Sequence, residues 1–136
     1  MKLHRLRKFS GNAVLEAALV IPVLSSLAFG TIEFGHFFFV KHTVEGAARE
    51  GARAGIVATA VNADVTTAVA NVMTAAGFAS NKYTLTTSPT TISGMAAGSN
   101  VTVTVQCTWG TVGIRPLSLI PATKTCTGTA VMRRES

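Results

Sequence analysis

The sequence is poor in charged residues and in the residue types from which catalytic sites are built. Asp, Glu, Lys and Arg make up 13% of the 136 residues, whereas a soluble domain usually has about 25%. Glycine and proline together number 16, which is too few for a collagen-like or low-complexity chain. The low charge argues against a freely soluble enzyme, and the length allows one domain.

No set of side chains in the sequence has the spacing that catalysis or metal binding needs. His4, His36 and His42 are scattered, and the chain has no Ser–His–Asp set and no phosphate-binding glycine loop. Glu16 and Glu33 are 17 positions apart, about 25 Å along a helix, so they cannot share a reacting atom. The sequence therefore predicts no enzyme, cofactor, metal site or small-molecule substrate.

The positive charge is concentrated at the N-terminus. The net charge is +6 and the pI is about 10.0, values that suggest nucleic-acid binding. Lys2, Arg5, Arg7 and Lys8 all fall within the first eleven residues, and without these residues the net charge is only +2. The remainder has no basic stripe with interleaved aromatic residues, so we expect a basic leader at residues 1–11 and no nucleic-acid partner.

A long apolar stretch follows the leader. Residues 13–40 are interrupted only by Glu16, Glu33 and His36. About 20 helical residues span a bilayer core, so this stretch predicts one transmembrane helix. Because Lys and Arg favour the cytoplasmic side, we expect a cytoplasmic N-terminus, a single pass through the membrane, and an outer part from Lys41 onward.

Two other interpretations of this stretch remain open. A secretory signal peptide cut after Ala28 would release a secreted binding module, but residues 29–40 would then stay apolar and exposed. A plain, uncleaved anchor explains the length of the stretch, yet it gives no reason for Glu16, because a carboxylate in a membrane helix is costly.

The start of the apolar stretch resembles the processing site of type IV pilin-like proteins. A basic leader ends at Gly11, and a glutamate, Glu16, follows inside an apolar helix. The resemblance implies that a prepilin peptidase cuts between Gly11 and Asn12, which makes Glu16 the fifth residue of the mature chain.

Further segments resemble one branch of this group, the TadE-like proteins. They read GNAVLEAALVIPVL, GTIEFGHFF, AAREGARAG and, near the C-terminus, TGTAVMRRE. The resemblance is dense over residues 11–55 and 123–135, while residues 60–122 hold no diagnostic motif. It implies a minor pilin or pseudopilin of the Tad (tight adherence, Flp-type) pilus, with adhesion as the purpose of the fibre. The implied partners are other pilin-like subunits, prepilin peptidase, the inner membrane and the Tad assembly platform.

Cleavage offers a physical role for Glu16. The cut leaves an α-amino group on Asn12 that is mostly protonated at neutral pH. A neighbouring subunit's Glu16 can pair with it, which lowers the cost of each charge in lipid and sets the register between subunits. The alternative is that Glu16 reaches the headgroups. Pro22 removes one helical hydrogen bond and predicts a kink, or else is tolerated without a role.

We expect the N-terminal helix to continue beyond the membrane, over residues 12–60. Gly51 and Gly55 are costly in a helix interior, so something must pack closely against them, either the outer domain or another pilin's helix. Arg49 and Arg53 each follow a glutamate by three or four positions. They form either a self-paired exposed face or a contact with acidic residues of a partner subunit.

Residues 61–136 predict a small periplasmic or extracellular α+β domain. Asn62 begins and caps a second helix, which Gly77 ends. Alternating apolar residues predict about three antiparallel strands, with the sheet packed on the second helix and on the outer half of the first. The expected strands cover residues 83–87, 100–109 and 123–132.

Two cysteines lie on the apolar faces of the last two predicted strands. Outside the cytoplasm such pairs usually oxidise, so we expect a Cys107–Cys126 disulfide. With 18 residues between its ends, this bridge would add about 3 kcal/mol in the chain-entropy model. The alternative is two buried free thiols; a metal site is disfavoured because no histidine is near.

Overall fold

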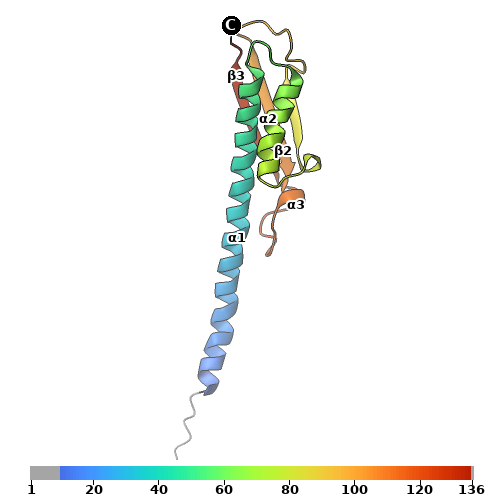
Figure 1. Ribbon diagram of the computed structural model, residues 1–136. Coiled ribbons are helices and arrows are strands. Elements are labelled where there is room, and N and C mark those ends of the chain that lie inside the picture. The colour runs from blue at the N-terminus through green and yellow to red at the C-terminus, as the bar shows by residue number, and fades with distance from the viewer. Residues whose placement is uncertain (1–9, 136) are drawn as a thin grey trace, which may run out of the picture.

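The dominant feature of the molecule is a single long helix that carries a small domain on its C-terminal half. A computed structural model describes residues 10–135, and most of the leader therefore lies outside the described residues. Helix α1 spans Ser10–Gly55, 46 residues in all. Its N-terminal half extends beyond the domain like a stem, and the C-terminus lies near the far end of α1 (Figure 1).

Helix α1 ends at Gly55, short of the expected residue 60, and the C-terminal residues supply the reason. The N–H of Glu135 donates to the carbonyl of Ile56 at 3.0 Å. The guanidinium of Arg134, which is buried, donates to the carbonyls of Ala58 and Ile92. Backbone carbonyls at a helix end need partners, and here the last residues of the chain provide them.

Helix α2 spans Asn62–Ala75 and begins and ends near the predicted positions. Its cap differs from the prediction: the carboxylate of Asp64 accepts the N–H of Val61 at 2.9 Å, while Asn62 bonds a distant loop instead. Gly77 has a φ of +85°, and the Phe78 N–H donates back to the Met73 carbonyl at 2.9 Å. This geometry is the Schellman ending that favours glycine.

Three antiparallel strands follow in the spatial order β1-β2-β3. Helix α2 is connected to them through a short 3-10 turn, η1 (Ser80–Lys82), and a four-residue helix, α3, separates the last two strands. Each strand lies within a residue or two of its predicted position. The strands and α3 are β1 (Thr84–Ser88), β2 (Asn100–Thr108), α3 (Trp109–Val112) and β3 (Thr125–Arg133).

One face of the sheet is covered by the outer half of α1 and by α2, as expected (Figure 1). Alternate residues of β2 and β3 point into this layer, because successive side chains of a strand face opposite sides. The fold is therefore α+β, as predicted, and its core contains α1 residues as well as sheet residues. The α1 and strand residues of this core are Val40, Val44, Ala47, Ala48, Ala52, Val101, Val103, Val105, Cys107, Cys126 and Ala130.

Helix α1 approaches the sheet closely at Gly128 of β3. A Cβ added there would lie 2.5 Å from the carbonyl oxygen of Val44 and 2.7 Å from the backbone of Glu45. Backbone atoms cannot move aside as a side-chain tip can, so this position requires glycine. Its lack of a side chain lets helix and strand backbones touch.

Candidate processing and assembly site

The residues predicted for cleavage lie at the free end of α1. Gly11 and Asn12 fall in its first turn, and Glu16 is exposed one turn further on. Every residue of the segment 12–32 is exposed or half-buried. A helix that is apolar on all sides and uncovered by its own domain is typical of a membrane span. Within residues 10–135, α1 contains the one stretch long and apolar enough to cross a bilayer.

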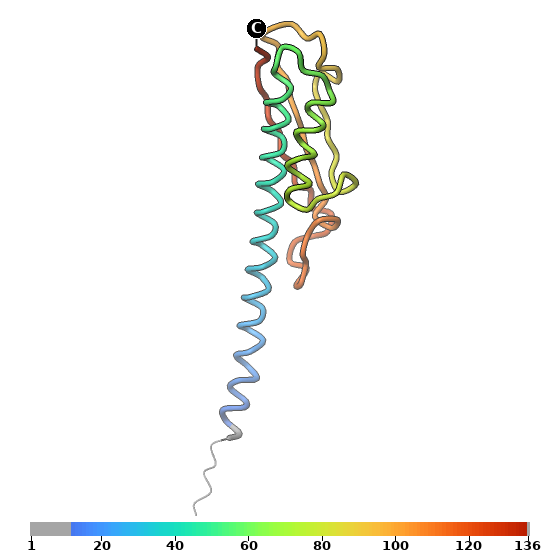
Figure 2. The backbone as a smooth tube through the Cα atoms, viewed as in Figure 1, coloured from blue at the N-terminus to red at the C-terminus, as the bar shows by residue number. Residues whose placement is uncertain are grey.

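Pro22 does not produce the predicted kink. Helix α1 is continuous through this position, and its free half follows a smooth course without a sharp bend (Figure 2). Ser26 Oγ donates to the Pro22 carbonyl at 2.8 Å, one turn further along the helix. Membrane helices tolerate proline when serine or threonine hydroxyls and local adjustments satisfy the freed backbone groups.

Glu33 is the first residue of α1 that the domain buries. Its side chain is fully buried, and its two carboxylate oxygens accept the N–H groups of Leu117 and Ile120 at 3.2 Å and 2.9 Å. Both donors belong to the loop of residues 113–121, which we call the tip loop. Sequence reasoning missed this role, although an acid inside an apolar stretch was the available signal.

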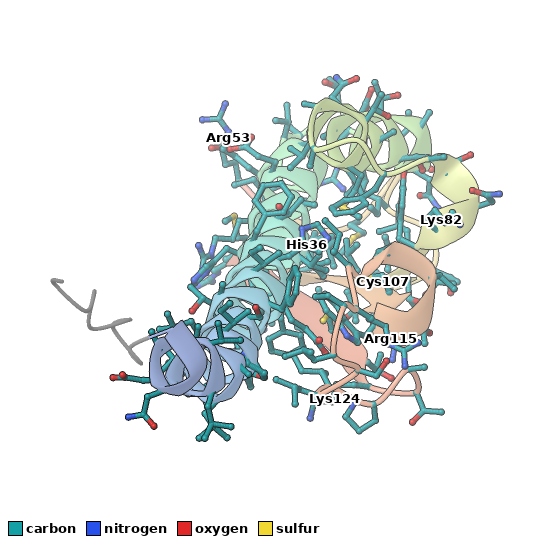
Figure 3. The ribbon with its side chains drawn as sticks, turned by 90° about the horizontal axis from the view of Figure 1, so that it is seen from below. His36, Arg53, Lys82, Cys107, Arg115 and Lys124 are labelled. Atoms are coloured by element: carbon teal, nitrogen blue, oxygen red, sulfur yellow. The ribbon has the colours of Figure 1, made fainter. Side chains whose placement is uncertain are left out.

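A second contact holds α3 to the same part of α1. His36 Nε2 lies 3.0 Å from the Val112 carbonyl oxygen. Since a carbonyl only accepts, Nε2 carries the proton here. The buried Trp109 ring stacks edge-on against Phe37, with 5.3 Å between centroids. In the view from the free end of α1, His36 lies between α1 and the rest of the domain (Figure 3).

Gly51 and Gly55 pack against the chain's own domain, which selects one of the two alternatives left open by the sequence. A Cβ at Gly51 would lie 2.6 Å from Val69 of α2 and 3.1 Å from Val103 of β2. A Cβ at Gly55 would lie 3.1 Å from both Val65 and Val101. The two glycines therefore let α1 nest between α2 and the sheet.

Arg49 and Arg53 lie on the opposite, exposed face of α1. Arg49 lies 3.7 Å from the Glu45 carboxylate, and Arg53 lies 3.5 Å from that of Glu50. Exposed pairs of this kind contribute little stability. The self-paired face is thus present, and binding of a partner's acidic residues remains a prediction.

Cys107 and Cys126 are direct cross-strand partners, and both are buried as free thiols. Directly opposed residues have Cα atoms about 4.5–5.5 Å apart, within the range that a disulfide spans. Burial, aided by the neighbouring thiol, raises the pKa of Cys107 to about 12. Burial also raises the pKa of Cys126, partly offset by Cys107 and by Lys124. The predicted disulfide therefore has suitable geometry and stays a prediction.

The described part of the chain, residues 10–135, holds no group of three or more His, Cys, Asp or Glu side chains placed to bind a metal. His4, one of the three histidines, lies outside these residues. Two polar side chains of α1 have a structural role. The Glu33 carboxylate accepts hydrogen bonds from the domain and His36 donates one to it, and these bonds attach the domain to α1.

Comparison with known families agrees with the geometry of α1. The model of the family described as TadE-like protein matches residues 11–53, which lie entirely within this helix. No curated protein and no solved structure matches the chain. The family relates the protein to Tad pilus systems, and the apolar helix agrees with anchoring in a membrane. Over residues 11–53 the predicted resemblance is confirmed, and this segment of α1 is similar to TadE-like proteins.

Proposed function

We propose that the protein is a minor pilin or pseudopilin that takes part in assembly of a Tad pilus. A prepilin peptidase cuts it between Gly11 and Asn12 on the cytoplasmic side of the inner membrane. The mature chain then stays in the membrane through the free half of α1 and joins other pilin-like subunits on the assembly platform. Its domain lies on the periplasmic or extracellular side, and the fibre serves adhesion.

One observation carries this proposal: the family match begins at residue 11, where cleavage is expected, and the helix that follows is free of the domain. A soluble protein would gain by covering these apolar residues, since burying apolar surface is favourable. Here residues 12–32 remain available to lipid and to other subunits. The protein needs no catalytic group, cofactor, nucleic acid or small-molecule substrate for this role.

In this proposal, the carboxylate of Glu16 sets the axial register between the helices of neighbouring subunits. It is exposed on α1, one turn beyond Asn12, whose α-amino group appears on cleavage. A charge within lipid is costly when alone and less costly when paired. Pairing the new amino group of one subunit with Glu16 of the next therefore favours one axial stagger between neighbouring helices.

The N-terminus of the mature protein tests the proposal directly. Mass spectrometry of the protein from its native host should find a chain that begins at Asn12, and the same gene in cells without prepilin peptidase should yield the uncleaved chain. A native chain that begins at Met1 would instead indicate an uncleaved, membrane-anchored scaffold of the machine. A start at Phe29 would indicate a secreted module.

The role of Glu16 has a separate test. The Glu16→Gln variant should be cleaved and inserted normally, but should lose cross-linking to neighbouring pilin-like subunits, because the amide cannot balance the amino group. Glu50→Gln, which changes an exposed acid beyond the apolar stretch, is the matched control and should cross-link like the native protein. Normal cross-linking of Glu16→Gln would refute the register role.

A further inference from the structure

We propose that the tip loop is a second membrane contact, which inserts Ile114, Leu117 and Leu119 into the outer boundary of the bilayer beside α1. This inference rests on the membrane residence of α1 given under the proposed function. The partner is the lipid surface itself, at the level where acyl chains meet headgroups.

The length of the free helix sets the height of the loop above the bilayer. Residues 13–32 rise about 30 Å, which equals the thickness of a bilayer core. Glu33, the next residue, is the first one that the domain buries. A bilayer that covers the free helix therefore ends at the level where the tip loop begins.

Leu119 reaches below that level. Its Cδ1 would lie 3.7 Å from a Cβ at Gly30, so the side chain lies beside a residue of the free, apolar segment. Gly30 is two residues, or about 3 Å, below Ile32. Any bilayer that reaches Ile32 also reaches Leu119. Figures 1 and 2 show the loop between α3 and β3 extending along α1 toward its free half.

The surface of the loop suits lipid rather than water. Ile114 and Leu119 are 52% and 53% exposed, and Leu117 is 37% exposed. An open groove continues this surface onto the helix, lined by Gly30, Phe34 and Leu119. Apolar area transferred from water to lipid contributes about 25 cal/mol per Å², and side chains at the headgroup boundary gain from such burial.

Backbone N–H groups without partners oppose the approach of a loop to lipid, and within the tip loop the N–H groups of Gly113, Leu117 and Ile120 have partners in the protein. Glu33 accepts the N–H groups of Leu117 and Ile120. Pro116 and Pro121 have no N–H to satisfy. The Gly113 N–H donates to the Trp109 carbonyl at 2.7 Å. The buried carboxylate thus serves the loop at a depth where water is scarce.

Two lysines lie beyond the tip loop, on the side away from the free helix, where lipid phosphates would be. Lys124 follows the loop and is exposed, and it lines an open pocket together with Lys41 and Phe37. Lysine side chains beside an apolar anchor extend toward headgroups, which agrees with this orientation.

Spin labelling of the full chain in vesicles tests the inference. Leu119→Cys, Val131→Cys and Leu24→Cys would each carry one nitroxide, in vesicles of phosphatidylethanolamine and phosphatidylglycerol. Val131, 58% exposed near the far end of β3, is the matched apolar control, and Leu24 reports on the free helix. The native cysteines are buried, so they should not take up label.

The expected result is an oxygen-to-nickel accessibility ratio at 119 that is several-fold above that at 131 and close to that at 24. A ratio at 119 equal to that at 131, with 24 in lipid, would overturn the inference and leave the anchor intact. Low accessibility to both reagents with spin–spin broadening would show that a second copy covers the loop, and would also overturn it. An aqueous label at 24 would refute membrane residence and the proposed function with it.

Discussion

Glu33 joins a loop to a helix by means of one side chain. Its carboxylate accepts two backbone N–H groups and is fully buried. Each buried donor left without a partner costs about 1–3 kcal/mol. A residue that looks like an interruption of the apolar stretch thus becomes the attachment point of the tip loop.

Replacing Glu33 should release the tip loop. In Glu33→Ala, the amides of Leu117 and Ile120 lose their acceptor, and we expect their hydrogen-exchange protection to fall about 5- to 100-fold. Glu33→Gln keeps one acceptor oxygen and should lose less. Glu50→Ala is the control and should leave these amides unchanged; equal protection in Glu33→Ala and native protein would contradict the assignment.

The paired thiols predict a pH dependence for the reduced protein. Because burial raises the pKa of Cys107 from 9.0 to about 12, the unfolded chain loses this proton first as the pH rises. The thiol therefore contributes full stability below about pH 9, and this contribution is lost as the pH rises toward 12.

Urea unfolding of reduced protein at about pH 8 and about pH 10 measures this effect, because the thiol titrates between these values in the unfolded chain. The native protein should lose more stability over this interval than Cys107→Ser, which controls for all effects of pH that do not involve this thiol. Identical losses would show that the buried thiol does not titrate differently in the folded state.

At the scale of elements, glycine decides how closely α1 approaches its neighbours. Gly51 faces Val69 and Val103, whereas a Cβ at Gly46 on the same helix would meet nothing within 4 Å. The same residue type therefore has a packing role at one position and none at the other.

The pair Gly51→Ala and Gly46→Ala separates packing from helix propensity. Alanine gains about 1 kcal/mol over glycine in a helix interior, so Gly46→Ala should stabilise the protein by up to that amount. Gly51→Ala should destabilise it, because overpacking a core costs about 1–3 kcal/mol and the facing valines are stiff and buried. Chemical denaturation measures both, and stabilisation by Gly51→Ala would refute the nested packing.

At the scale of the whole molecule, α1 has two different environments along its length. Its free half is apolar on all sides, while its outer half supplies Val40, Val44 and Ala48 to the core. The outer domain is therefore not residues 61–136 alone, because its core is incomplete without the helix that precedes them.

Truncated chains test this dependence. A chain of residues 31–136 retains Glu33, Phe37 and the outer half of α1, and should show cooperative unfolding and near-ultraviolet circular dichroism from Trp109. A chain of residues 61–136 leaves the sheet face uncovered and should show neither. Cooperative folding of the shorter chain would contradict the structure's division of the core.

Much of the fold follows from local patterns. Alternating valines predict β2 because every second residue of a strand faces the core, and Gly77 predicts the end of α2 because only glycine adopts its positive φ readily. Two local predictions failed for a tertiary reason: Asn62 bonds the loop at Ile92 rather than capping its helix, and α1 stops early because Arg134 binds the turn that follows.

The sequence by itself determined the free helix and the positions of the strands, because these depend on apolar length, charge order and period. The predicted cleavage position at Gly11 comes from the resemblance of this segment to pilin-like proteins. Only the tertiary structure decided which residues face Gly51 and Gly128, and that Glu33 holds the tip loop. Glu33, for example, binds backbone groups of residues 84 and 87 positions further along the chain. No local pattern encodes a distance of that kind, because it is set by how the sheet packs on the helix.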